Sequence, residues 1–264
     1  MREFQRAASK IKEGNVVVFT GLGISCESGI PTFRGSEGLW ERYNPARYAT
    51  MPQALFTLLE SPQEIADFVI DFYEMFNCAQ PNIAHNIIAE LEQKNIVTYV
   101  ITQNIDNLHQ DAGSQNVCEL HGNACEAICI RCGFKEKRTK EDIAAFTEGL
   151  KSLRKRWELL KYMMRYIGKC PECNVRLRPN IVFFGEMLPP EELKKAKEVA
   201  RNCKCFIIVG TSGVVYPAAN IPYEAKHSGA FLIEINIVPS YRDIADIIIE
   251  SPACKAFEGI SKYL

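Results

Sequence analysis

The fold is decided by a short stretch in which an apolar run meets two closely spaced glycines: Val16-Val17-Val18-Phe19-Thr20-Gly21-Leu22-Gly23. Such a run of β-branched and aromatic residues is typical of a strand buried on both faces. Glycines after the strand allow backbone N–H groups to approach a diphosphate without interference from a Cβ atom. We therefore expect a nucleotide-binding loop on a parallel sheet. A plain turn, which also favours glycine, stays open as an explanation for the pair.

The glycine-rich loop continues to Gly35 and departs from the spacing G-x-G-x-x-G, because Gly29 follows Gly23 by six positions. Phe33 and Arg34 lie in its second half. A guanidinium beside an anion site pairs bidentately with phosphate, so Arg34 is a candidate phosphate ligand. Phe33 either shields a reacting group from water or packs locally.

Length and composition indicate one large domain with a smaller satellite. The chain has 264 residues, of which 47% are hydrophobic, and its net charge is −1. This charge argues against a nucleic-acid surface along the whole chain, although it does not exclude a local basic patch. No apolar stretch approaches the roughly 20 residues of a membrane span, and the first residues lack the apolar core of a signal peptide. We expect a soluble cytoplasmic protein without a membrane partner.

Four of the eleven cysteines form two C-x-x-C pairs, Cys129 with Cys132 and Cys170 with Cys173. Four thiolates are the ligand set of a closed, structural Zn²⁺ site. The pairs are 37 residues apart, more than the usual separation of about 15–20, which indicates an insertion. Disulfides or unrelated thiols are the alternatives, and a reducing compartment disfavours the first. The other cysteines are expected to be mostly small buried residues. Cys26, in the glycine-rich loop, is the one candidate for a reactive thiol.

Helical and strand periodicities alternate along the chain, which predicts an α/β fold with a parallel sheet and helices on both faces. The zinc-binding region interrupts this pattern. The predicted helices are 3–12, 62–76, 84–93, one opening at 189–192, and 218–227; the predicted strands and apolar runs are 16–19, 96–102, 117–120, 181–184, 205–209, 230–235 and 246–249.

Polar residues follow several predicted strands directly. Gln103-Asn104-Ile105-Asp106 follows one strand, His121 another, Gly210-Thr211-Ser212 a third and Asn236 a fourth. Each group alone is explained by a turn or a cap, but the carboxyl ends of parallel strands share one edge, where ligands bind. We interpret His121 as a general base rather than a turn histidine. His85 and His109 are interpreted as structural hydrogen-bonding residues.

These motifs, in this order, resemble those of the sirtuins, the NAD-dependent protein deacylases, over nearly the whole chain. The matching stretches are Gly21–Gly35, Gln103–Asp106, Leu120–Gly122, the four cysteines, Phe183–Glu186, Gly210–Ser212 and Glu234–Asn236. The resemblance implies a discontinuous Rossmann-like NAD-binding domain formed by 1–34, 81–124 and 179–264. The smaller module consists of a helical part, 35–80, and a zinc-binding part, 125–178. NAD and acyl-lysine are expected to meet between domain and module.

The implied activity is the removal of acyl groups, most often acetyl, from protein lysines, with release of nicotinamide and O-acyl-ADP-ribose. His121 would take a proton from the ribose, Asn104 would stabilise the reacting ribose, and Asp106 would hold the nicotinamide amide. Two alternatives stay open, an ADP-ribosyltransferase or NAD hydrolase and an inactive NAD-sensing zinc scaffold. The remaining implied cofactor contacts are Gly21, Leu22, Gly23, Ser25, Phe33, Arg34, Gln103, Gly210, Thr211, Ser212 and Asn236; the implied substrate contacts are Tyr73, Val182, Phe184, Gly185 and Val214.

Three positions depart from the family pattern. Leu22 stands where alanine is usual, and it either narrows the nicotinamide side or points into the core. Gly213 replaces a commonly larger residue and is expected to loosen its loop. The stretch Tyr73-Glu74-Met75-Phe76 lacks the arginine of the Tyr-x-x-Arg pair that binds succinyl and malonyl groups. Acidic acyl groups are therefore expected to bind poorly.

The insertion between the cysteine pairs, residues 134–169, holds eleven basic and five acidic residues, a net charge of +6 against −7 for the rest of the chain. Its apolar residues Leu150, Leu153, Trp157, Leu160 and Met164 recur at helical spacing, which predicts one amphipathic helix that packs this stripe on the zinc module. A solvated basic face is the favoured interpretation. A docking surface for an acidic partner stays open, with nucleic acid the less favoured occupant.

Overall fold

The computed structural model describes residues 2–31 and 39–264. The chain forms two compact units, each assembled from segments that are distant in sequence. Unit 1 comprises Met1–Ile30, Gln80–His121 and Leu188–Leu264, and unit 2 comprises Pro31–Ala79 and Gly122–Met187. Among the described helices, none is long and apolar enough to cross a membrane.

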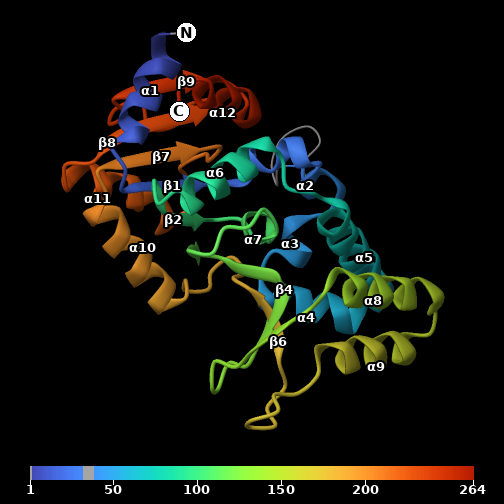
Figure 1. The fold of residues 1–264 in the computed structure, drawn as a ribbon. Helices are drawn as coiled ribbons and strands as arrows, with labels where there is room; N and C mark the ends of the chain where they lie inside the picture. The colour runs from blue at the N-terminus through green and yellow to red at the C-terminus, as the bar shows by residue number, and fades with distance from the viewer. Residues whose placement is uncertain (1, 32–38) are drawn as a thin grey trace. The chain divides into compact units, whose positions relative to one another are not determined.

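Unit 1 contains a six-stranded sheet in which every neighbouring pair is parallel (Figure 1). The strand order is β3-β2-β1-β7-β8-β9, so the chain moves outward from β1 in one direction and then outward from β7 in the other. This confirms the predicted parallel α/β fold class. The strands are β1 (Val16–Thr20), β2 (Val97–Thr102), β3 (Val117–Glu119), β7 (Cys205–Val209), β8 (Phe231–Asn236) and β9 (Ile247–Glu250).

Helices cover both faces of this sheet, as its fully buried central strands require. On one face, α1 (Arg2–Lys12), α6 (Ile83–Gln93) and α12 (Ala253–Ser261) share a core with Val16 and Val18 of β1. Successive side chains of a strand point to opposite faces. Phe19 of β1 therefore lies on the other face, where its ring stacks on that of Phe206 at 6.0 Å. The helices α10 (Pro190–Asn202) and α11 (Ile221–His227) belong to this second face (Figure 1).

The connection order reverses between β1 and β7, which lie side by side at the centre of the sheet. In open parallel sheets the loops at the carboxyl ends of two such strands diverge to opposite faces and leave a ligand site between them. The loops after Thr20 and Val209 occupy this position. They are the glycine-rich loop and the Gly210-Thr211-Ser212 loop.

Unit 2 combines helices with a small antiparallel sheet in the order β5-β4-β6. The short elements α2 (Leu39–Arg42) and α3 (Pro45–Tyr48) precede two longer helices, α4 and α5. The remaining elements are α4 (Met51–Glu60), α5 (Pro62–Cys78), β4 (Gly122–Ile128), β5 (Lys135–Lys137), α8 (Lys140–Ser152), α9 (Arg156–Ile167) and β6 (Arg178–Ile181).

The predicted single helix in the insertion is wrong. Leu153 and Lys155 have extended backbone conformations, so the chain forms two helices, α8 and α9, which lie side by side (Figure 1). After the break, the buried residues of α9 do not continue the predicted spacing. Leu159 and Met163 are the buried residues of α9, whereas Trp157 is 60% exposed and Met164 39% exposed. The predicted stripe therefore does not pack as a unit.

Candidate active site

The two loops at the switch point pack backbone against backbone. The Gly21 amide donates to the Val209 carbonyl at 3.0 Å, and the Gly23 amide donates to the Gly210 carbonyl at 2.8 Å. A Cβ atom on Gly23 would lie 2.6 Å from the Cα atom of Gly210. Gly21 has a φ of −121°, so a left-handed turn does not explain that glycine. The pair is needed for the close approach of the two loops.

We predict that Gly23→Ala lowers the free energy of unfolding by about 1–3 kcal/mol, as overpacking of a tight contact does. The added methyl group meets backbone atoms of Gly210, which cannot swing away as a side chain can. NAD affinity should fall as well, because the two loops form the proposed cradle. Urea denaturation and calorimetric titration with NAD measure the two effects. Unchanged stability would show that the loops separate without cost.

A buried polar cluster joins the loop after β1 to the loop after β2. The Ser25 hydroxyl donates to Asp106 Oδ2 at 2.7 Å, and Asn104 Nδ2 donates to the Ser25 oxygen at 3.0 Å. All three residues are buried. Burial raises the pKa of Asp106, against the opposing effect of hydrogen bonds from the Leu108 amide, Ser25 and Asn104. Three residues predicted to contact the cofactor therefore lie in one hydrogen-bonded group.

Threonines at the ends of two strands fix the backbone under this cluster. These threonines were not predicted as site residues. Thr20 donates to the Thr102 hydroxyl at 2.9 Å and lies 3.0 Å from His109 Nε2. The Asn104 amide donates to the Thr102 hydroxyl at 3.0 Å. Burial lowers the pKa of His109 well below its ordinary value, so this buried ring is neutral. A threonine at the last position of both β1 and β2 was the available sequence signal.

The Gly210–Ser212 loop is tied to neighbouring strand ends through Thr211. Gln103 Nε2 donates to the Thr211 hydroxyl at 2.9 Å, and Asn236 Nδ2 donates to its carbonyl at 2.8 Å. Asn236 and Thr211 were both predicted to contact the cofactor, and the structure brings them together. Ser212, predicted with them, is exposed.

A buried glutamate positions the loop that follows β8. Glu234 accepts hydrogen bonds from the amides of Ser240 and Tyr241, at 2.6 and 3.0 Å, although it is fully buried in the strand. The ring of Tyr241 lies 3.2 Å from the position of a Cβ atom on Gly213, where φ is +66°. Glycine is thus required at position 213 by its backbone conformation and by the neighbouring ring.

His121 lies two residues after the end of β3, and its imidazole is oriented by a backbone carbonyl. Its Nδ1 atom lies 2.8 Å from the Gln103 oxygen. A carbonyl only accepts, so Nδ1 carries the proton and Nε2 keeps its lone pair. Burial lowers the pKa of His121, although the bond to the Gln103 carbonyl opposes this shift. The ring is therefore neutral at pH 7 and able to accept a proton at Nε2.

The remaining loop residues are placed as follows. Leu22 is partly buried and so is not a residue of the core. Burial and the neighbouring Glu27 raise the pKa of Cys26, which keeps this exposed thiol protonated and poorly nucleophilic. Phe33 and Arg34 lie outside the described residues.

The four paired cysteines gather in unit 2, and their sulfur atoms all lie within 4.8 Å of one another. Cys129 and Cys173 are 3.4 Å apart, Cys132 and Cys170 3.5 Å, and Cys132 and Cys173 3.8 Å. Tetrahedral zinc with Zn–S bonds of about 2.3 Å separates its sulfur ligands by about 3.8 Å. The sulfur positions thus fit one Zn²⁺ ion. The ion would join the turn after β4 to the turn before β6.

The turn after β6 is held by a bidentate ion pair. Arg178 Nη1 and Nη2 donate to the two carboxylate oxygens of Glu186, each at 2.9 Å, and the Phe183 amide donates to the same carboxylate at 3.1 Å. Although burial alone would raise the pKa of Glu186, Arg178 and the Phe183 amide hold it below its ordinary value. This pair supports the segment that carries Val182, Phe184 and Gly185, three predicted substrate contacts.

Within unit 2, the predicted substrate contacts do not all line one cavity. Tyr73 lines a cavity of about 80 Å³ in unit 2, formed by α5, α8, α9 and the small sheet. The described residues that line this cavity do not include Val182, Phe184 or Gly185. Phe184 is 49% exposed, and Val214, which belongs to unit 1, is 56% exposed.

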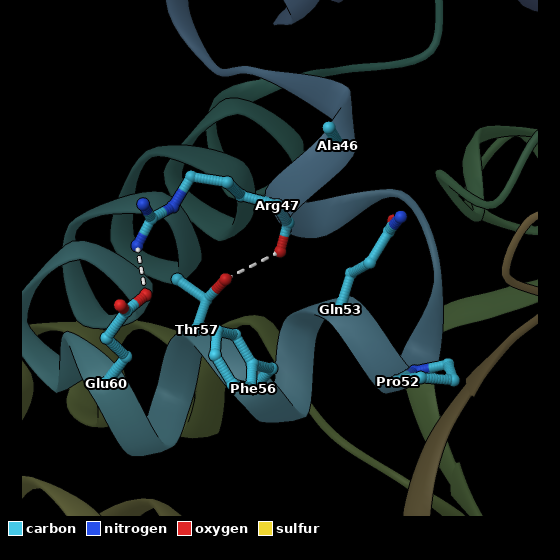
Figure 2. A pocket seen from close by; sticks show the side chains of 7 residues that line it. All are labelled: Ala46, Arg47, Pro52, Gln53, Phe56, Thr57 and Glu60. Atoms are coloured by element: carbon cyan, nitrogen blue, oxygen red, sulfur yellow. Dashed lines mark hydrogen bonds and ion pairs between the residues drawn. The ribbon is translucent and has the colours of Figure 1, made fainter.

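A hollow of about 350 Å³ between α3 and α4 contains no predicted site residue (Figure 2). Arg47 spans it to Glu60 at 3.4 Å, while Thr57 donates to the Arg47 carbonyl at 3.0 Å. Its lining residues are Ala46, Arg47, Pro52, Gln53, Phe56, Thr57 and Glu60. The two charged residues of the hollow, Arg47 and Glu60, pair with each other. The described lining therefore gives no indication of a ligand.

Comparison with known proteins gives one consistent result. The model of the Sir2 family matches residues 21–217. The NAD-dependent protein deacylase of Pyrococcus abyssi is 43% identical over 240 residues, which cover 90% of this chain and 88% of that protein. A solved structure described as a structural basis for the mechanism and regulation of Sir2 enzymes covers 100% of this chain and 99% of its own, at 38% identity and a TM-score of 0.74. The structure of Sir2Tm bound to a propionylated peptide covers 98% of both chains, at 32% identity and a TM-score of 0.76.

Proposed function

The chain belongs to the Sir2 family, and from this premise we propose that it removes acyl groups, acetyl foremost, from protein lysines in an NAD-dependent reaction. The products would be nicotinamide, the free lysine and O-acyl-ADP-ribose. The observation that carries the proposal is the position of Gln103. Its carbonyl orients His121, its side chain binds Thr211, and its neighbour Asn104 belongs to the buried cluster with Ser25. The predicted base and both halves of the predicted cofactor site thus meet at one residue.

The switch point fits NAD, which supplies an activated ribose when it is bound. The backbone cradle of Gly21, Gly23 and Gly210 would face the diphosphate, and Thr211 and Asn236 would hold the adenosine half. Asn104, Ser25 and Asp106 would surround the nicotinamide ribose. Their mutual hydrogen bonds fix these side chains before the ligand arrives, which reduces the entropy lost on binding. Phe33, Arg34, Leu22 and Ser212 complete the proposed contact set.

His121 would act as the base through Nε2. The Gln103 carbonyl fixes the tautomer, so no rearrangement is needed before a ribose hydroxyl gives up its proton. The lowered pKa keeps the base unprotonated at pH 7. The water-poor setting of a partly buried imidazole also limits the competing hydrolysis of NAD.

Mass analysis of the products tests this function. Incubation with NAD and an acetyl-lysine peptide should give O-acetyl-ADP-ribose together with the deacetylated peptide. Free ADP-ribose alone would indicate an NAD hydrolase, and a protein heavier by one ADP-ribose unit would indicate a transferase. The comparisons favour deacylation, since relatives across most of the chain are named as deacylases.

We predict that the substrate-binding segment depends on the Arg178–Glu186 pair. Glu186→Gln removes one acceptor from the bidentate contact and should lower kcat/KM for the acyl peptide about tenfold, while KM for NAD changes less than twofold. Steady-state kinetics with each substrate varied separately measures the split. Glu141→Gln, a change of the same kind at an exposed site on α8 of unit 2, serves as the control. An equal rise in both KM values would contradict a local role.

We predict that acetyl peptides are deacylated at least tenfold better than succinyl peptides. The helix α5 offers no arginine at the position where family members hold an acidic acyl group, and Tyr73 in this stretch is buried. An unpaired carboxylate in an apolar acyl site is costly to desolvate. The ratio of kcat/KM values on matched peptides measures the preference. Equal or better desuccinylation would refute it.

Protein substrates with acyl-lysine are the partners that this function requires. Val182, Phe184, Gly185, Val214 and Tyr73 are retained as the proposed contacts for the substrate. An acidic partner at residues 134–169 stays a prediction from the sequence. A cytoplasmic location stays a prediction from the sequence.

A further inference from the structure

The helix α9 is fixed to unit 2 through one face only. Leu159 and Met163 are buried on that face, and the ring of Tyr166 stacks on Phe146 of α8 at 3.7 Å. Tyr162 stacks on the same Phe146 ring at 5.7 Å. These contacts define the side of α9 that packs on unit 2. The opposite side of the helix faces solvent.

That outer side combines an exposed aromatic residue with cations. Trp157, Lys161, Met164 and Arg165 follow one another at the spacing i, i+4, i+7 and i+8, which places them on one stripe. Trp157 is 60% exposed, and Lys161 and Arg165 are exposed as well. Arg156 extends the cationic surface at the start of the helix. We call these five residues the α9 stripe.

The cations of the α9 stripe are not neutralised by the protein. Among the residues described here, no carboxylate lies within 4.0 Å of Arg156, Lys161 or Arg165. The neighbouring cations Lys151 and Arg154 make contacts within unit 2. Lys151 pairs with Glu74 and Glu148, and Arg154 donates to the carbonyls of Lys151 and Leu153 at the end of α8.

The unpaired charges are complementary to an anionic ligand with repeated charges, and the exposed Trp157 ring is complementary to a planar apolar group. Trp157, Lys161 and Arg165 are spaced by about 6 Å along the helix axis. Single-stranded nucleic acid offers phosphates in series and unpaired bases that stack on aromatic rings, whereas a duplex keeps its base faces hidden. An acidic peptide would neutralise the cations, but only a single strand supplies a planar ring with every charged unit.

We infer that the α9 stripe binds single-stranded nucleic acid, with a base stacked on Trp157 and phosphates paired with Arg156, Lys161 and Arg165. No residue of the NAD-binding cluster takes part, so this binding is separable from catalysis. With about three phosphate contacts the affinity should fall about 20-fold between 50 and 200 mM salt. Sequence preference should be weak, since no base edge is read.

Fluorescence anisotropy of a labelled 15-nucleotide oligo-dT with the full chain tests this inference. Arg156→Glu/Lys161→Glu/Arg165→Glu should weaken binding at least 20-fold at 50 mM salt. Arg6→Glu/Lys255→Glu/Lys262→Glu makes the same charge change on exposed sites of unit 1 and should weaken it less than threefold. Trp157→Ala should cost about tenfold, the loss of one stacked base. Retained deacetylation by each variant verifies folding.

Four results would overturn the inference. The first is no binding of oligo-dT at 50 mM salt, and the second is equal losses in the two charge-reversed triples. The third is binding that is unaffected by Trp157→Ala or equally strong for a duplex of the same length. The fourth is displacement of oligo-dT by poly-glutamate at equal charge concentration, which would assign the surface to an acidic protein partner.

Discussion

His121→Ala is expected to lower kcat for deacetylation about 10³-fold, because a positioned general base contributes on the order of 10²–10⁴ to the rate. The bond from His121 Nδ1 to the Gln103 carbonyl shows that Nε2 is the free basic atom. Replacement by alanine removes that atom and leaves the neighbouring Asn104–Ser25–Asp106 cluster intact. NAD affinity should therefore change less than threefold. Steady-state kinetics and calorimetric titration give the two values.

The pH dependence of the wild type gives an independent signature of the same base. The pKa of His121 is lowered from 6.5 by burial, so the fraction of neutral imidazole falls only in more acidic solution. The plot of kcat/KM should stay flat through neutrality and decline below pH 6.5. His227→Ala, at an exposed histidine on α11, should leave both rate and profile unchanged. A retained acid limb in His121→Ala would assign the titration to another group.

Removal of zinc is expected to have the largest effect on stability. Among the described residues, the core cluster around the site has four buried members, Ala127, Cys129, Cys170 and Leu177, with Phe134, Ile167, Cys173 and Val175 partly buried against them. A cluster of this size is too small to fold without a further cross-link. Structural zinc supplies on the order of 10 kcal/mol to small metal-dependent folds. Cys170→Ala should therefore lower the melting temperature by more than about 10 °C and reduce the zinc content from one ion per chain to none.

Elemental analysis and thermal denaturation measure these two effects, and Cys78→Ala is the matched control. Cys78 is an exposed cysteine at the end of α5 in the same unit, so its replacement should change neither value. Full stability of Cys170→Ala, or of wild type after chelation, would contradict a structural metal. Zinc content above one ion per chain would indicate additional ligands.

The central sheet was predictable because its strands are buried on both faces and read as unbroken apolar runs. The segments 16–19 and 205–209 carry the signal in four and five consecutive apolar residues, respectively. The antiparallel sheet of unit 2 has no such signal. Its central strand, Gly122–Ile128, consists largely of small and polar residues, and it is held by pairing with its neighbours and not by its own β-propensity.

The site was predictable to the extent that strand ends place polar residues at one edge. His121, Asn104 and Asp106 were identified on this basis. Thr20, Thr102 and Glu234 were not identified as positioning residues, because their hydrogen bonds to loops that are distant in sequence depend on the tertiary structure. The break between α8 and α9 was missed for a related reason. Helical spacing continued across Leu153–Lys155, and only tertiary packing selects Leu159 and Met163 over Trp157 as the buried side.

The central claim is that NAD cleavage is coupled to the acyl-lysine substrate at the cluster around Gln103. The most direct test is the stoichiometry of products in one reaction, with nicotinamide and freed lysine measured together by chromatography. We predict one nicotinamide released per lysine freed, and release that depends on the acyl peptide. Nicotinamide released at the same rate without the peptide would contradict the claim.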